Sequence, residues 1–322
     1  MLAEGTIGFA FAGNKFVGSV QRDGTGALYS TDLNGGNVQV FAPTVSLAAN
    51  PSSEHFLTSS LGLGGFPSRD IYVASANGIV HITNDGGSSD VFVSGLSGAV
   101  RGILFDSVGS FGHDMLVTTI LGNVYRIKSD GSTQLLAAVG EDTEGLDIAP
   151  PGFGAFGGQL VVASEGSGRL RAITTGGVVT DLSATFGFTI PGAEELTFVP
   201  LNLGASGNPV EGFYGANYTP NVVKADASQF AGFQGDAIVT SETTGHVFRV
   251  HWNGSTFVVT DVGQFPNQPE DGIFVTAAII NPRPGPAPET IPTLNQWGTF
   301  GLILLLAAAS VHRIRKRSVA TR

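Results

Sequence analysis

Acidic side chains recur along the chain directly before short apolar segments that have the character of β-strands. Carboxylate oxygens are hard ligands, so several of them at one place can bind Ca²⁺ or support metal-assisted hydrolysis. One of the corresponding places holds an arginine and another an isoleucine, which would break the symmetry of a metal cage. In chain order, the residues at these places are Ile7, Glu54, Arg101, Glu144, Glu194 and Asp271.

These residues form a common site only if the fold brings segments that are far apart in the sequence to one axis. The alternative is that the carboxylates are solvated charges at loop ends, with Arg101 paired to one of its neighbours. The sequence assigns no definite cofactor, and Ca²⁺ is the candidate that oxygen ligands favour. The six histidines are scattered, and none of the common hydrolase or nucleotide-binding motifs is present.

The acidic positions belong to an internal repeat of four short strands separated by glycine-rich turns. Its clearest copies, residues 101–139 and 144–184, align strand by strand: GILFDS with GLDIAP, DMLVTTI with GQLVVAS, NVYRIKS with RLRAITT, and TQLLAAV with VVTDLSA. Successive copies start about 40–50 residues apart, a period typical of β-propeller blades. We therefore predict an all-β propeller over residues 1–280, with a sandwich or an irregular β-solenoid as the alternative. The first strands of the copies begin near Gly8, His55, Gly102, Gly145, Glu195 and Gly272.

The number of blades is open at this point, because the sixth first strand is followed by proline-rich sequence instead of three more strands. Either the propeller has five blades and the last strand is redundant, or it has six and the final blade is incomplete. An open blade would expose an unpaired strand edge. We favour six blades, with closing strands and a signal peptide supplied by sequence upstream of Met1, since the start MLAEGTIGFAFAG lacks the features of a signal peptide.

The repeat that begins near Glu195 contains a long insertion, residues 200–234, rich in aromatic, glycine and asparagine residues. A long loop on a rigid scaffold is a common place for binding. Tyrosine beside asparagine suits a carbohydrate or protein ligand, whereas the alternative is that the aromatic rings plug the channel or cap the core. The candidate binding residues are Phe213, Tyr214, Asn217 and Tyr218.

Composition excludes several classes of function. The net charge is −10 and the pI is near 4.9, so we expect no nucleic-acid partner. The chain has no cysteine, which excludes disulfides and thiolate metal sites. Basic residues concentrate at the C-terminus, where five of the 16 lie in the last ten positions.

The C-terminal segment has the order of a membrane anchor. A proline-rich linker, residues 281–290, precedes an apolar helix predicted over about 298–312, and Trp297 stands where an interface residue would. The positive-inside rule leaves the basic cluster in the cytoplasm and the propeller on the other side. The alternative is a helix buried in the globular domain. The basic cluster consists of Arg313, Arg315, Lys316 and Arg317.

The tail, residues 291–322, resembles the IPTL-CTERM protein-sorting domain of Gram-negative bacteria, which is similar to the PEP-CTERM tails handled by exosortases. The matching positions are Ile291, Pro292, Thr293, Leu294, Trp297 and Gly298. The resemblance implies a membrane-embedded, exosortase-like partner, a temporary anchor in the inner membrane, and delivery to the cell envelope or the outside. Members normally also carry an N-terminal signal peptide, which this start lacks.

Strand order and blade pitch resemble NHL and gluconolactonase-like propellers, which use acidic residues and asparagine at one mouth of the channel. The first functional hypothesis is a non-enzymatic, exported binding protein for extracellular polysaccharide or protein. The second is a metal-dependent hydrolase or lactonase-like enzyme that uses the carboxylate-lined mouth. Convergence of the carboxylates in a concave pocket would favour the second hypothesis.

Overall fold

A computed structural model describes residues 5–49 and 54–280. The predicted linker, sorting motif, transmembrane helix and basic cluster lie outside these residues. None of the helices within the described ranges combines the length and the apolar character that crossing a bilayer would require.

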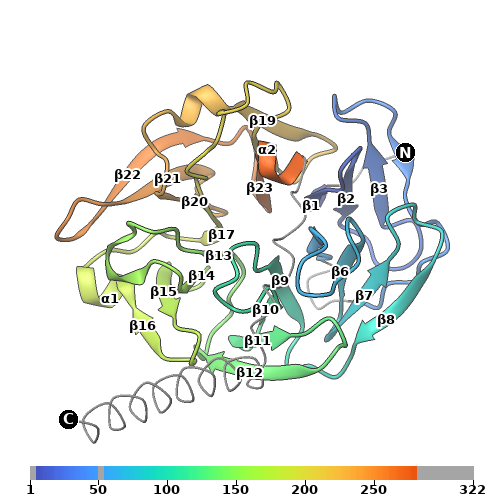
Figure 1. The fold of residues 1–322 in the computed structure, drawn as a ribbon, viewed down its shortest axis with the longest axis horizontal. Coiled ribbons are helices and arrows are strands. Elements are labelled where there is room, and N and C mark those ends of the chain that lie inside the picture. Colours follow the sequence, from blue (N-terminus) through green and yellow to red (C-terminus); the bar gives the residue numbers. More distant parts are fainter. Residues whose placement is uncertain (1–4, 50–53, 281–322) are drawn as a thin grey trace, which may run out of the picture. The chain divides into compact units, whose positions relative to one another are not determined.

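The described residues form a six-bladed β-propeller, which confirms the predicted fold class and the version with an incomplete last blade. Each blade is an antiparallel sheet with one edge strand nearest the central axis (Figure 1). The strands of each blade are given below from this innermost strand outward. Blade 1 consists of β1 (Thr6–Phe11), β2 (Phe16–Val20), β3 (Leu28–Thr31) and β4 (Gln39–Val40). Blade 2 consists of β5 (Leu57–Ser59), β6 (Ile71–Ser75), β7 (Gly78–Ile82) and β8 (Ser89–Val93). Blade 3 consists of β9 (Val100–Phe105), β10 (Met115–Thr119), β11 (Asn123–Ile127) and β12 (Thr133–Ala138).

The remaining blades follow the same plan with one exception in chain order. Blade 4 consists of β13 (Leu146–Ile148), β14 (Leu160–Ser164), β15 (Arg169–Ile173) and β16 (Val179–Asp181). Blade 5 consists of β17 (Ala193–Phe198), β20 (Ala237–Ser241), β21 (His246–Trp252) and β22 (Phe257–Gln264). Blade 6 consists of β23 (Gly272–Val275), β18 (Gly212–Ala216) and β19 (Val222–Asp226). The helical pieces are α1 (Leu182–Phe186), α2 (Ala277–Ile280) and two 3₁₀ turns, η1 (Gly154–Phe156) and η2 (Ala227–Phe230).

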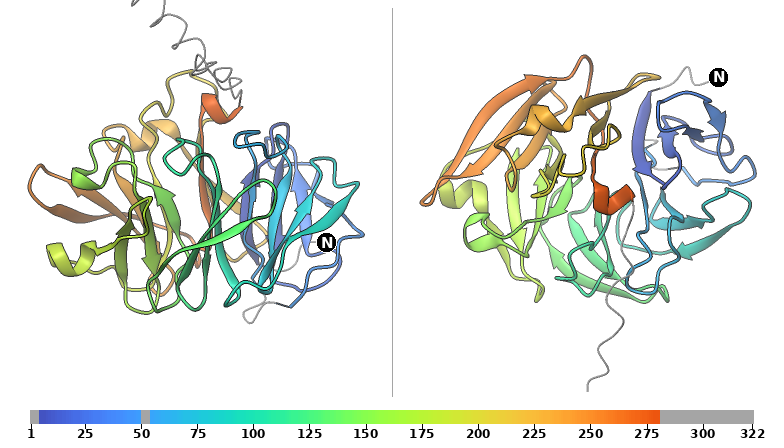
Figure 2. Two further views of the ribbon diagram at one scale, coloured as in Figure 1. Left: turned by 60° about the horizontal axis from the view of Figure 1, so that its bottom comes forward. Right: turned by 45° about the horizontal axis from the view of Figure 1, so that its top comes forward.

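The innermost strands close into a ring. Strands β1, β5, β9, β13, β17 and β23 each contact the next one, and β23 contacts β1. They all run in the same direction along the axis, so their N-terminal ends gather at one mouth of the channel. Helix α2 directly follows β23 and lies at the opposite end of that strand (Figure 2).

The core lies between neighbouring blades, because each sheet is covered on both faces. The middle strands therefore bury consecutive residues instead of alternating ones, as β14 does over its whole length. Burying both faces removes more apolar surface from water than a half-exposed sheet would. Between blades 2 and 3, for example, Tyr72, Val117 and Ile127 pack in one cluster.

Blade 6 corrects the prediction for residues 200–234. That segment contains β18 and β19, and β18 pairs with both β19 and β23. The alternation of Phe213 and Tyr214 in β18 buries one ring on each face of the sheet, in two different clusters. The insertion in blade 5 is thus most of blade 6.

The same pairing corrects the expectation that closing strands must come from upstream of Met1. Blade 6 takes its second and third strands from the chain between β17 and β20. The first and last blades then join directly, since the Thr6 N–H donates to the Thr219 carbonyl at 3.0 Å.

Candidate metal centre at the channel mouth

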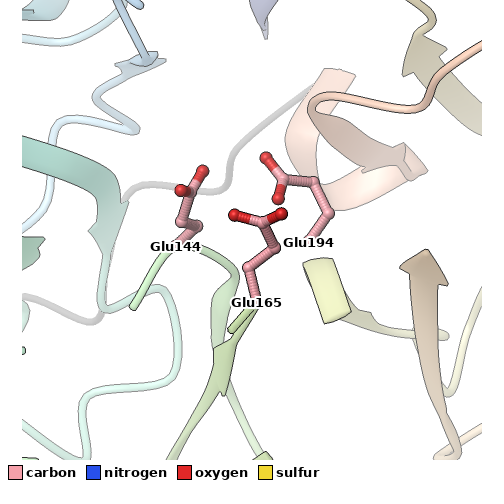
Figure 3. A group of neighbouring side chains, drawn as sticks. All are labelled: Glu144, Glu165 and Glu194. Atoms are coloured by element: carbon pink, nitrogen blue, oxygen red, sulfur yellow. The ribbon is translucent and has the colours of Figure 1, made fainter. Parts of the chain in front are cut away.

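Three carboxylates converge at the N-terminal ends of the inner strands. Glu144 precedes β13, Glu194 lies at the start of β17, and Glu165 follows β14. One ligand oxygen from each lies within 4.8 Å of the others, and the three side chains point into a common space (Figure 3). This spacing is what a shared divalent cation would need from its protein ligands.

Burial makes this cluster unusual. Glu144 and Glu194 are only 4% and 2% exposed. Among the described residues, Glu194 Oε2 has no hydrogen-bond partner, although it is buried. A buried acceptor without a partner costs about 1–3 kcal/mol, so a proton or a cation at this carboxyl group would be stabilising.

The positive charge of Arg101 offsets the negative charge on only one side of the carboxylate cluster. Its guanidinium bridges Glu54 and Asp142, the latter at 2.9 Å, and reaches Glu144 at 3.3 Å. The pairing of Arg101 that the alternative expected is therefore present, with Glu54 and Glu144. The rest of that alternative does not hold for Glu144 and Glu194, which are buried and not solvated. Glu165 and Glu194 are left facing each other and Glu144.

Two further carboxylates extend the cluster toward blade 6. Gln268 donates one hydrogen bond to Glu242 and another, at 2.8 Å, to Glu270. Glu242 follows β20, as Glu165 follows β14, so blades 4 and 5 place a glutamate at the same point of the repeat. The mouth is thus lined with carboxylates from blades 4, 5 and 6, and with Arg101 on the blade 3 side.

Two aspartates, Asp147 and Asp271, each lie shortly after one of the mouth glutamates in the chain and make different contacts. Asp271 accepts hydrogen bonds from the N–H groups of Phe9 and Gly272, both at 2.7 Å. Asp147 accepts from the Phe198 N–H at 2.7 Å. Each aspartate therefore links one inner strand to the next by a hydrogen bond, a contact that we call the clasp. The predicted mouth residue Asp271 is thus not at the mouth, and Glu270 holds that position in blade 6.

The carboxylates border a central cavity of about 230 Å³. Its wall also contains Glu195 and apolar side chains of the inner strands, such as Phe56 and Ile103, and it extends to Ile279 of α2. The cavity is therefore concave and acidic at one end and apolar along its length.

Burial and mutual repulsion favour protons on these groups. Burial raises the pKa of Glu194 well above its usual range, and Glu144 raises it further. Burial, together with Glu242 and Glu144, raises the pKa of Glu270 to about 9. Burial likewise raises the pKa of Asp271 to about 7, although two backbone N–H groups oppose the shift. These shifts favour the protonated, neutral forms of the three carboxyl groups near neutral pH.

Sequence reasoning found Glu144 and Glu194 but missed Glu165, Glu242 and Glu270. A signal was present, since VVASEGSG and IVTSETTG align with a glutamate directly after the second strand of the repeat. Blades 2 and 3 have Ala76 and Ile120 at the same point. Comparing strand ends as well as strand beginnings would have identified the pair.

The predicted aromatic binding residues belong to the packed interior of blade 6. Phe213, Tyr214 and Asn217 are buried, and the Tyr214 hydroxyl donates to the Val210 carbonyl at 2.8 Å. Tyr218 is half-buried, and its hydroxyl bonds to Gln21 in blade 1. Of the two alternatives for these rings, ligand binding or a place in the core, the burial of Phe213 and Tyr214 favours the core.

Comparison with known proteins supports the fold and no finer assignment. No protein-family model matches the chain, and no curated protein sequence does. A chain of a nidogen–laminin complex is similar to it, with 16% identity over 84% of both chains and a TM-score of 0.56. A Bacteroides thetaiotaomicron protein of unknown function has 10% identity over 84% of this chain and 64% of its own, with a TM-score of 0.50. A streptogramin B lyase has 12% identity over 84% of this chain and 87% of its own, with a TM-score of 0.46. At such low identity the likeness establishes a shared β-propeller fold.

Proposed function

We propose that this chain is an exported binding protein that holds a divalent cation, Ca²⁺, in its channel mouth and binds an extracellular ligand there. One observation carries the proposal: Glu144, Glu165 and Glu194 bring ligand oxygens within 4.8 Å of one another, and the buried Glu194 Oε2 has no partner among the described residues. A cation would pair with that oxygen and would take the place of the protons that otherwise offset the repulsion between these carboxylates.

The ligand class follows from the same geometry. Ca²⁺ takes six to eight oxygen ligands, and the three central glutamates supply three when each binds through one oxygen and six when each binds through both. Glu242 and Glu270 lie beside the cluster, and water or the ligand itself would complete the shell. Hydroxyl and carboxylate oxygens of a polysaccharide fit this role, and so do acidic side chains of a protein.

We expect Ca²⁺ to raise the melting temperature, and to do so more at pH 8 than at pH 5.5. Glu270 has a pKa of about 9 in the folded protein against an ordinary value of 4.5. Between these values the folded state holds the extra proton, so the stability of the metal-free protein falls as the pH rises. Ca²⁺ must displace such protons, and it therefore binds better at the higher pH.

The measurement is a thermal melt with and without Ca²⁺ at both pH values. At a concentration of 100 times the Kd, a bound ion adds about 2.7 kcal/mol of stability. Mg²⁺ at the same ionic strength is the control, because it demands a tighter octahedral shell. An equal shift at both pH values, or none with either ion, would contradict a carboxylate cation site.

A metal-dependent hydrolase of the lactonase-like kind is the second candidate. The observation in its favour is the place of Glu270, whose pKa is raised to about 9 by burial and by Glu242 and Glu144, beside carboxylates that a cation would keep ionised. This is the arrangement of a general acid beside a metal-activated water. Turnover of lactone or ester substrates by the Ca²⁺-loaded protein, lost in Glu270→Gln, would support it. Ca²⁺ binding without turnover of these substrates would contradict the hydrolase and agree with a binding protein.

The export part of the proposal rests on the tail sequence. We expect a Gram-negative host with an exosortase-like enzyme to remove the tail near Ile291–Leu294 and release the propeller from the inner membrane. Intact mass spectrometry of the mature protein would show the shortened C-terminus. Replacing these four residues with alanine should leave full-length protein in the inner-membrane fraction, whereas alanine substitutions within the 281–290 linker should not.

A further inference from the structure

Within residues 5–49 and 54–280, the sixth blade has three strands where the other five have four. Its order is β23–β18–β19, so β19 is the outer edge of the blade and lies near the rim of the propeller (Figure 1). In every other blade, a fourth strand pairs with the strand at this position. No strand of the described part of the chain pairs with this edge of β19.

The backbone groups that face this edge follow from the pairing of β18. The Ala216 N–H donates to the Asp271 carbonyl at 2.8 Å, and the Glu270 N–H donates to the Ala216 carbonyl at 3.0 Å. Ala216 thus pairs on the β23 side, and alternate residues of a strand pair on opposite sides. Gly215 then pairs toward β19, where its partner in the register is Val223.

Alternation along β19 leaves Val222, Lys224 and Asp226 facing outward. The Asp226 N–H already donates to the Gln229 side chain at 2.8 Å. Val222 and Lys224 therefore present their backbone N–H and C=O groups to the open edge, which makes a template for one more antiparallel strand.

A groove of about 570 Å³ lies beside this edge, between blades 6 and 1. Its floor is aromatic: the Phe16 ring lies 5.0 Å from that of Phe9 and 4.6 Å from that of Tyr214, centroid to centroid. Val38, on the blade 1 side, is 52% exposed. The groove is thus an apolar trough that runs along a strand edge.

Charge indicates what kind of strand fits. Among the described residues that line the groove, Lys224 is the one with a charged side chain, and it contacts Asp226 at 2.8 Å. The fourth strands of three other blades, β8, β16 and β22, each combine apolar residues with one aspartate. A strand with that pattern would put apolar side chains into the groove and a carboxylate near Lys224.

We propose that the edge of β19, with its groove, accepts an extended strand of a partner protein in which apolar residues alternate with polar ones and include an acidic residue. Recognition combines main-chain hydrogen bonds to Val222 and Lys224 with apolar contacts to the groove, the mode known as strand addition. The site is independent of the cation centre, since it lies at the other end of the blade.

A labelled peptide copy of β22, FVVTDVGQ, tests the proposal by fluorescence anisotropy with the full chain. We expect saturable binding that a scrambled peptide, with the alternation broken, does not show. Lys224→Pro should weaken binding at least tenfold, because proline removes an outward N–H while leaving the β18 ladder intact. Lys224→Gln keeps that N–H and should weaken binding only a few-fold, through the lost charge.

Melting curves and Ca²⁺ titrations of both variants show whether the propeller is still folded. Equal binding to the two peptides, or unchanged binding to a folded Lys224→Pro variant, would overturn the proposal. Dimerisation of the chain that is lost in Lys224→Pro, without peptide binding, would also overturn it, because a second copy would then be the occupant.

Discussion

Glu194→Gln should abolish measurable Ca²⁺ binding and, at the same time, make the metal-free protein more stable at pH 8. The amide keeps the size of the side chain but removes a carboxylate that burial and Glu144 force to hold a proton. At pH 8 this carboxyl group ionises more readily in the unfolded chain than in the folded protein, and that difference favours unfolding. Glutamine does not ionise, so the substitution removes the difference. A gain of about 1 kcal/mol would raise the melting temperature by about 2–4 °C.

Glu195→Gln is the matched control. Glu195 is the next residue, and burial and Asp271 raise its pKa well above the usual range, but it does not belong to the three-carboxylate cluster. It should gain stability in the metal-free form and keep its Ca²⁺ affinity. Calorimetric titration with Ca²⁺ and melts in EDTA measure the two quantities separately. If Glu194→Gln binds Ca²⁺ like the parent protein, the site has been assigned to the wrong residues.

Asp271→Ala should destabilise the propeller at the seam between its last and first blades. Asp271 is the acceptor for the N–H of Phe9, at 2.7 Å, and for that of Gly272. Alanine would leave both donors without this partner, and each buried donor left unsatisfied costs about 1–3 kcal/mol. We expect a melting temperature lower by several degrees and faster proteolysis near the N-terminus.

Asp147→Ala tests the same clasp inside the ring, where Asp147 joins blade 4 to Phe198 of blade 5. Its thermal effect should be similar, but the N-terminal segment should stay protected, because that seam is not the closure of the ring. Limited proteolysis followed by mass spectrometry distinguishes the two variants. Equal N-terminal cleavage in both would show that Asp271 has no special part in ring closure.

The sequence by itself determined the architecture of blades 1–5. Each of blades 1–4 is formed by consecutive strands, so its pattern of apolar strands and glycine turns is local and visible in the repeat. It also placed Glu144 and Glu194 together, because the fold brings the starts of neighbouring inner strands to one mouth. The pairing of Arg101 with a neighbouring carboxylate was expected in one of the two alternatives, but the burial of Glu144 and Glu194 was not part of that alternative.

Only the tertiary structure decided how blade 6 is built. β18 pairs with β23, about 60 residues later in the chain, and this pairing carries no local signature. A segment such as GFYGA reads equally as an aromatic loop or as a strand, and burial between blades 6 and 1 is what selects the strand. The sequence therefore left open whether the aromatic side chains bind a ligand or cover the core, and the structure places Phe213 and Tyr214 in the core.

The membership of the cation cluster also depended on tertiary structure, for two physical reasons. A shift of one residue moves a side chain to the other side of a strand, so adjacent acidic residues in EDG separate into Glu270 at the mouth and Asp271 in the clasp. Glu165 and Glu242 come from turns after second strands, which reach the mouth only because antiparallel pairing returns the chain to the end where the inner strand began.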